Sequence, residues 1–170
     1  DGERRFGQHQ RVGRHHALDH GLGHREIGFL VALPFGVVVL LMCLGPRDHH
    51  RPQTGADLRS EAEFILGESL EAVRAVPFNH SAGQREEIYQ IHSAIAAADS
   101  GDGVLVLTDL MGASPSNRVA TLLEHHNAVM VTGVNLAMLL CVWANRDMPL
   151  GQLTRKAVDC GKRSVKIFQK

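Results

Sequence analysis

The segment Val104-Leu-Val-Leu-Thr-Asp-Leu-Met-Gly-Ala-Ser-Pro-Ser-Asn117 contains the clearest chemistry in the sequence. Its first four residues are apolar, which is enough for a buried strand, and Asp109 then falls at the carboxyl end of that strand. In the turn that follows, Gly112 can adopt a positive φ without steric cost. Ser114 suits the N-cap of a helix, and Pro115 suits its first position. The segment therefore predicts a strand, a short loop and a capped helix.

A loop of this kind is typical of an anion site. The N–H groups at a helix start are unpaired, and the helix dipole is positive there. An ordinary turn between a strand and a helix would explain the loop alone, but Asp109 favours a functional interpretation. A carboxylate repels a bound anion unless a cation lies between them, and a histidine fits, because the carboxylate fixes its tautomer and stabilises its charged form. The segment therefore predicts that an imidazole from elsewhere in the chain completes the site.

The overall composition is that of one globular domain. The chain has 170 residues, of which 44% are hydrophobic and 21% are charged, enough for a core of ordinary size. Its formal net charge is zero, which argues against binding to nucleic acid or to an anionic membrane surface. Cys43, Cys141 and Cys160 show no metal or redox spacing, so a reduced cytoplasmic protein is predicted.

The composition changes along the chain. Most of the histidines lie in the first fifty residues, and we interpret residues 1–35 as a disordered or non-native extension. The folded domain is expected over 36–170. The apolar run 27–44 just reaches the length of a membrane span, but Pro34 interrupts it. Alternatively, Gly36 to Met42 forms a buried first strand.

Hydrophobic spacing and punctuation residues predict alternating strands and helices. Thr54 and Ser81 are the expected N-caps of the first two helices, and Gly161 is expected to end the last one. His125 and His126 are explained by the favourable dipole at a helix C-terminus. Strands are expected at 36–42, 73–78, 104–108, 128–132 and 164–168, and helices at 54–67, 83–98, 115–124, 136–143 and 150–160. This order predicts an α/β, doubly wound, mostly parallel sheet with helices on both faces and its site at the carboxyl ends of the strands.

The motif Gly103 to Asn117 is similar to the core motif of the mannose-type enzyme IIA domains of the bacterial sugar phosphotransferase system (PTS). Val131 to Leu139 resembles a second motif of that family, and the resemblance extends over about 54–168. It implies a phosphocarrier that takes a phosphoryl group from phospho-HPr onto a histidine and passes it to enzyme IIB. It also implies indirect association with the membrane enzyme IIC/IID complex, and a homodimer that exchanges its last strand, here Ser164 to Phe168.

The resemblance also assigns roles to residues of the opening segment. Asp109 matches the aspartate that contacts the active histidine, and Ser114 matches the serine beside the phosphoryl group. Gly112, Ala113 and Ser114 would cradle the phosphoryl oxygens. Neither a metal nor a cofactor is expected, because backbone amides supply the positive field.

The sequence departs from the family pattern at the acceptor itself. By position the active histidine should be residue 51, which is Arg51, and Pro52 stands where glycine is usual. Arginine binds an anion but does not carry a phosphoryl group in this chemistry. His50, one residue earlier, is the candidate acceptor, ahead of His49. The alternative is a regulatory module of the same fold that lacks the acceptor, and a second rival interpretation is the related phosphotransfer subunit of dihydroxyacetone kinase. We hypothesise that residues 1–53 are read out of frame, which sequencing across this junction would test.

Overall fold

A parallel sheet forms the centre of the part of the chain that this computed structural model describes, residues 38–42, 55–77 and 83–169. Its strands follow the order β2-β1-β3-β4, and each neighbouring pair is parallel. The register of β1 against β3 pairs Val39 with Leu105 and Met42 with Thr108. The α/β fold with a parallel sheet is therefore confirmed. The strands are β1 (Val38–Met42), β2 (Val73–Ala75), β3 (Val104–Thr108) and β4 (Ala128–Thr132).

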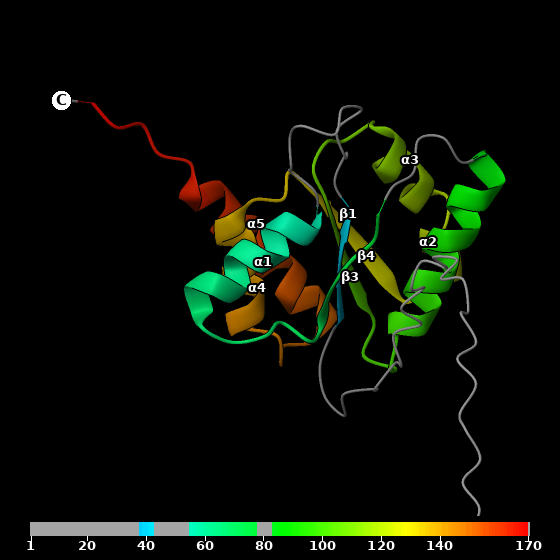
Figure 1. Cartoon of the computed structure of the whole chain (residues 1–170), viewed down its shortest axis with the longest axis horizontal. Coiled ribbons are helices and arrows are strands. Elements are labelled where there is room, and N and C mark those ends of the chain that lie inside the picture. Colours follow the sequence, from blue (N-terminus) through cyan, green and yellow to red (C-terminus); the bar gives the residue numbers. More distant parts are fainter. Residues whose placement is uncertain (1–37, 43–54, 78–82, 170) are drawn as a thin grey trace, which may run out of the picture.

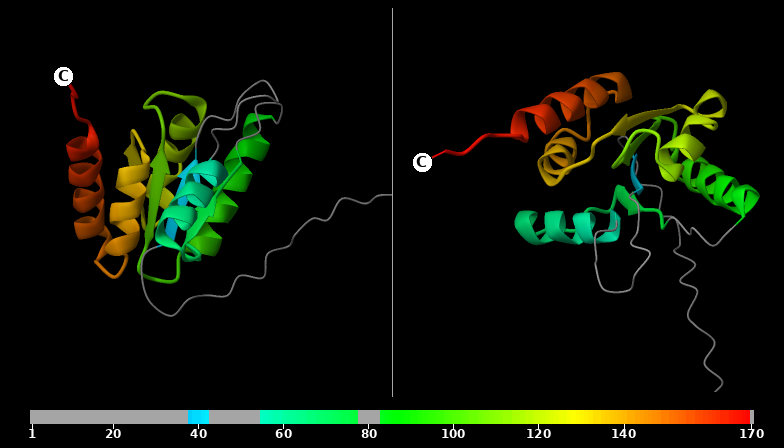
Figure 2. Two further views of the ribbon diagram at one scale, coloured as in Figure 1. Left: turned by 60° about the vertical axis from the view of Figure 1, so that its left-hand side comes forward. Right: turned by 90° about the horizontal axis from the view of Figure 1, so that it is seen from above.

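Helices cover both faces of this sheet (Figures 1 and 2). In Figure 1, α1, α4 and α5 lie on the left of the strands, whereas α2 and α3 lie on the right. The view from above in Figure 2 shows the same two layers. The helices are α1 (Gly55–Leu66), α2 (Gln84–Ala98), α3 (Ser114–Ala120), the short 3-10 helix η1 (Leu123–His125), α4 (Leu136–Ala144) and α5 (Leu150–Ser164).

The central strand β3 explains why both faces are covered. Successive side chains of a strand point to opposite faces of the sheet. Leu105 and Leu107 join the core that includes residues of α1, α4 and α5. Val104 and Val106 join the second core, which includes residues of α2 and α3. All five residues of β3 are buried, so an uninterrupted apolar run is the pattern that such a strand requires.

The first strand comes from the apolar run near the N-terminus. β1 lies between β2 and β3, and Val39 is only 1% exposed. The interpretation of Gly36 to Met42 as a buried strand is therefore confirmed for Val38–Met42. No helix within the described ranges is long and apolar enough to cross a membrane. The remainder of the run 27–44, the extension 1–35 and the predicted caps Thr54 and Ser81 lie outside those ranges.

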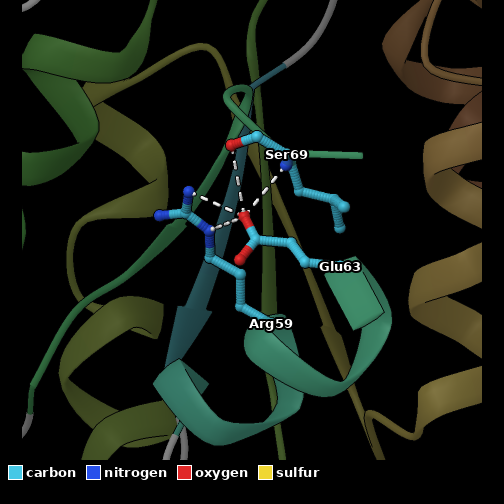
Figure 3. Close-up of polar contacts among 4 residues, drawn as sticks. Arg59, Glu63 and Ser69 are labelled. Atoms are coloured by element: carbon cyan, nitrogen blue, oxygen red, sulfur yellow. Dashed lines mark hydrogen bonds and ion pairs between the residues drawn. The ribbon is translucent and has the colours of Figure 1, made fainter. Parts of the chain in front are cut away.

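A cluster of polar contacts fixes the turn between α1 and β2 (Figure 3). Glu63 Oε1 accepts hydrogen bonds from the Leu70 amide at 2.9 Å and from Arg59 Nε at 2.9 Å, and a longer one from Ser69 Oγ at 3.5 Å. The Leu70 amide, aided by Arg59 and Ser69, holds the pKa of Glu63 below its ordinary value, while burial opposes this. Gly67, at φ +71°, provides the left-handed turn that ends α1.

Two predictions for the C-terminus are wrong for the single chain. Helix α5 does not stop at Gly161 but continues to Ser164. A Cβ at Gly161 would stand 2.5 Å from Met138 Cε, so this glycine allows α5 to approach α4 closely. Residues 165–169 form no strand. Val165, Ile167 and Phe168 are 77%, 88% and 90% exposed, because no described strand of the same chain takes them as a neighbour.

Two of the three cysteines are paired in the fold, which their positions in the sequence did not predict. Cys141 of α4 and Cys160 of α5 form a disulfide, with their Sγ atoms 2.09 Å apart. Their spacing of 19 residues gave no redox signal, whereas the packing of α4 on α5 brings their Cα atoms to 6.3 Å. Cys43 lies outside the described residues.

Candidate functional site

The connection between β3 and α3 leaves the sheet at the carboxyl end of the central strand, along the top of Figure 1. Asp109, its first residue, is partly buried, and its Oδ1 accepts a hydrogen bond of 2.7 Å from the Leu110 amide. The neighbouring connection after β4 is tied to the same place. The Gly133 amide donates to the Asp109 carbonyl at 2.8 Å, and the Val134 amide donates to the Thr108 carbonyl at 3.0 Å. The backbone around Asp109 is therefore fixed by β4 as well as by β3.

Gly112 gives the loop its sharp turn. Its φ of +83° lies in the left-handed region, which a residue with a Cβ enters at a cost. The Ala113 amide closes this turn with a hydrogen bond of 3.2 Å to the Leu110 carbonyl. Gly112 and Ser114 are both exposed. The loop thus presents backbone and a hydroxyl group to the solvent at this edge of the sheet.

Helix α3 starts one residue earlier than predicted. Ala113 is the N-cap and makes no side-chain capping bond, while Ser114 is the first helical residue and Pro115 follows it. The expectation of Ser114 as the cap is therefore wrong, and the Ser114 hydroxyl is not used for capping. The helix ends at Ala120 and not near Glu124. With seven residues it has only a small dipole, so the local N–H groups determine most of its effect on an anion.

Two residues that the sequence analysis did not single out bond to this loop. Ser116 Oγ lies 2.8 Å from the Leu110 carbonyl and 2.9 Å from the Ala113 carbonyl. Asn117 Nδ2 donates to the Gly112 carbonyl at 2.9 Å. Serine and asparagine readily form such local bonds to backbone groups, and their place just after the helix start was the available signal.

An ion pair joins α3 to α2. Arg118 Nε lies 3.1 Å from Glu87 Oε2 of α2, and the Glu87 side chain is only 7% exposed. Arg118 is also partly buried. Because the two helices pack on the same face of the sheet, this contact fixes the direction of α3 independently of the loop's own hydrogen bonds.

The chain that follows β1 starts at the same edge as this loop. Met42, the last residue of β1, is the register partner of Thr108. Parallel strands end at a common edge, so the chain leaves β1 beside the place where Asp109 leaves β3. His50, the candidate acceptor, belongs to the connection between β1 and α1. It lies outside the described residues, as do His49, Arg51, Pro52 and His80.

Two further histidines contact each other near the opposite edge of the sheet. His126 precedes β4 by two residues, and its ring makes an edge-on contact with His92 of α2 at a centroid distance of 4.7 Å. Burial lowers the pKa of His126, and the neighbouring His92 and His125 lower it further, while Asp99 acts in the opposite direction. The explanation of His126 by a favourable helix dipole is therefore wrong, because its surroundings disfavour the charged form; it packs at the end of η1, not at the end of a long helix.

Comparison with known proteins places this fold in a family. The profile of the family described as "PTS system fructose IIA component" matches residues 49–158. The chain is 32% identical over 117 residues to the PTS system mannose-specific EIIAB component of Escherichia coli (strain K12). That match covers 66% of this chain and 35% of the relative, so the chain spans about a third of the length of that protein. The profile match and β1 both start before residue 54, and both oppose an out-of-frame origin for all of residues 1–53.

Solved structures show the same architecture. The mannose/sorbose specific IIA subunit of the phosphotransferase system from Enterococcus faecalis aligns with a TM-score of 0.68 at 18% identity, covering 80% of this chain and 97% of that one. The phosphotransferase system component EIIA from Streptococcus agalactiae aligns with a TM-score of 0.63 at 20% identity, covering 77% and 96%. At these identities the likeness shows the fold. Because the family profile covers well over half of the sequence, the chain belongs to the family of PTS system fructose IIA components, the mannose-type enzyme IIA proteins.

Proposed function

We propose that this chain is a histidine phosphocarrier of the sugar phosphotransferase system. An unprotonated ring nitrogen of His50 attacks the phosphorus of phospho-HPr, the P–N bond to the HPr histidine breaks, and that imidazole leaves with the bonding electrons. The same exchange in the next step passes the phosphoryl group to a histidine of enzyme IIB. Each step exchanges one P–N bond for another, so neither a metal nor a cofactor is required.

The observation that carries this proposal is the parallel register of β1 and β3. Because of this register, the connection that contains His50 begins at the edge of the sheet where Asp109, Gly112 and Ser114 follow β3. The Asp109 carboxylate would orient the imidazole and stabilise the charge that it gains on phosphorylation. The amides of Gly112 and Ser114 would bind the phosphoryl oxygens, whereas the Ala113 amide already donates to the Leu110 carbonyl. Family membership supports the same reaction class.

We further propose that the chain works in the cytoplasm with HPr and enzyme IIB, and reaches the membrane enzyme IIC/IID complex only through them. A reducing cytoplasm would open the disulfide between Cys141 and Cys160. The exposed apolar side chains of Val165, Ile167 and Phe168 support a homodimer in which residues 165–168, the part of the predicted strand beyond α5, pair with a second copy.

The test is phosphorylation by purified components. The full chain is incubated with enzyme I, HPr and labelled phosphoenolpyruvate, and the label is examined for the acid lability and base stability of phosphohistidine. We expect the wild-type chain and His49→Ala to take label and His50→Ala to take none. Label that persists in His50→Ala would place the acceptor elsewhere.

The alternative is a regulatory module of the same fold without an acceptor. Its basis is Arg51, which occupies the position where the family motif requires the histidine. Absence of label from the wild-type chain, with HPr and a positive-control enzyme IIA fully labelled, would reject the carrier and support this module. Transfer of label onward to enzyme IIB would reject the module.

A further inference from the structure

The loop between β3 and α3 has its carbonyl groups bound by the first turn of α3. Ser116 is 1% exposed, and its hydroxyl lies within hydrogen-bond distance of the carbonyls of both Leu110 and Ala113, at 2.8 and 2.9 Å. One hydroxyl hydrogen serves two acceptors, so the hydroxyl bridges the two ends of the loop. Ala113 completes the arrangement, because its amide donates to the Leu110 carbonyl and its carbonyl accepts from the Asn117 amide.

Asn117 binds the remaining turn of the loop. Its side-chain amide donates to the Gly112 carbonyl at 2.9 Å, although the residue itself is exposed. This hydrogen bond holds the carbonyl of the residue whose positive φ makes the sharp turn of the loop. Ser116 and Asn117 together therefore engage the carbonyl oxygens of Leu110, Gly112 and Ala113.

The N–H groups of the same loop differ from its carbonyl groups in their hydrogen bonding. Within the described parts of the chain, no backbone carbonyl of a turn or loop accepts a hydrogen bond from the N–H groups of Met111, Gly112 and Ser114. Carbonyl oxygens repel the oxygens of a phosphoryl group, whereas N–H groups attract them. Holding the carbonyls toward α3 leaves the amides as the groups available to an anion at this edge of the sheet.

We propose that Ser116 and Asn117 are positioning residues for phosphoryl transfer, which set the orientation of the loop peptides without touching the phosphoryl group. This inference rests on the proposed phosphocarrier function. It assigns the two side chains a role beyond capping, because the three carbonyls that they bind belong to the loop that would hold the phosphoryl oxygens.

The fold permits a clean test of this role. Arg118 and Glu87 hold α3 against α2 independently of the loop, so variants at residues 116 and 117 are expected to keep the helix in place. Thr121→Ala is the matched control, since Thr121 Oγ1 donates to the Arg118 carbonyl at 2.8 Å at the far end of the same helix. Asn117→Asp keeps the side-chain shape but replaces the donor with an acceptor, and Asn117→Gln restores a donor.

The first measurement is the rate of phosphoryl transfer from phospho-HPr to each full-length variant. We expect Ser116→Ala and Asn117→Asp to slow transfer at saturating phospho-HPr by roughly tenfold or more, the effect of a small misplacement of binding groups. Thr121→Ala should stay within about twofold and Asn117→Gln should recover most of the rate. A loss confined to the half-saturating HPr concentration, or equal losses in Thr121→Ala and Ser116→Ala, would overturn the inference.

The second measurement does not depend on the carrier reaction. Inorganic phosphate is titrated against each variant while the backbone amide resonances of Met111, Gly112 and Ser114 are followed. We expect these amides to respond in the wild-type chain and in Thr121→Ala, and to respond several-fold more weakly in the two loop variants. If the wild-type chain takes no label, the carrier function fails and the role in phosphoryl transfer fails with it, even where the two side chains still orient the loop amides toward inorganic phosphate. If the wild-type chain takes label and the loop variants match it in both measurements, the inference fails while the carrier function stands. The absence of both label and amide response in the wild-type chain would overturn both.

Discussion

Replacing Gly112 with alanine separates the shape of the loop from the stability of the fold. Gly112 has a φ of +83°, and a Cβ built on it meets nothing within 4 Å. The substitution therefore adds backbone strain without a steric overlap. Gly67 is a matched control, because it has a φ of +71° and equally open surroundings, but it ends α1 before the turn to β2.

The expected loss of stability is small and similar at the two positions. An alanine in the left-handed region costs about 1–2 kcal/mol, and the reduced freedom of the unfolded chain offsets about 0.4–1 kcal/mol of that. A net destabilisation of roughly 1 kcal/mol follows for Gly112→Ala and for Gly67→Ala. Gly103→Ala should cost roughly 2–4 kcal/mol, because its Cβ would also stand 2.9 Å from the Asn127 carbonyl oxygen and 2.7 Å from Leu150 Cδ2.

The assay combines urea unfolding with the rate of label transfer from phospho-HPr. We expect Gly67→Ala to transfer at the wild-type rate and Gly112→Ala to transfer roughly tenfold more slowly, because a strain of about 1–2 kcal/mol shifts the loop toward conformations whose peptides do not hold the phosphoryl oxygens. Equal transfer rates in the two variants at equal stability would refute the role of the positive φ. A Gly103→Ala protein as stable as Gly112→Ala would refute the packing argument.

Three further predictions concern stability. Glu63→Gln should be less stable than the wild type by roughly 1 kcal/mol at pH 7. This difference should shrink as the pH falls below the ordinary value of 4.5, since a carboxyl with a lowered folded pKa loses its stabilisation on protonation. The pKa of His126 is lowered in the folded state, so the unfolded state binds more protons below about pH 6.5. The free energy of unfolding should therefore fall as the pH drops through this range. His126→Phe should remove this dependence on pH, measured by urea unfolding at several pH values. Reduction of the disulfide between Cys141 and Cys160, 19 residues apart, should lower the free energy of unfolding by about 3 kcal/mol, measured with and without reductant.

Each of these has a contrary outcome. A Glu63→Gln difference that is constant from pH 7 to pH 3 would show that the charge of this carboxylate is not what stabilises the turn. A wild-type stability that rises on acidification from pH 7.5 to 6 would contradict the sign argued for His126. Equal unfolding midpoints in oxidised and reduced protein would show that the disulfide adds nothing to the packing of α4 on α5.

The local pattern of the sequence was sufficient for most of the fold. The apolar run in β3 and the alternation of strands and helices predicted the parallel sheet. These features depend on neighbouring residues, so they can be read along the chain. Gly161 was misjudged for the opposite reason, because its function is to admit Met138 from another helix and not to end its own.

Part of the candidate site could likewise be predicted from the sequence, and the rest was decided by the fold. The chain sequence alone identified Asp109, Gly112 and Ser114, because strand end, turn and helix start are adjacent in one segment, and their resemblance to a family motif pointed to a histidine partner. Only the folded chain shows that these residues share an edge of the sheet with the end of β1. Only the folded chain shows that Ser116 and Asn117 bind the loop carbonyls. It also decided the pairing of Cys141 with Cys160. Strand register, side-chain direction and helix packing bring together residues that are distant in sequence. The free energy that selects this arrangement comes from burial of the whole core, and no single segment contains that core.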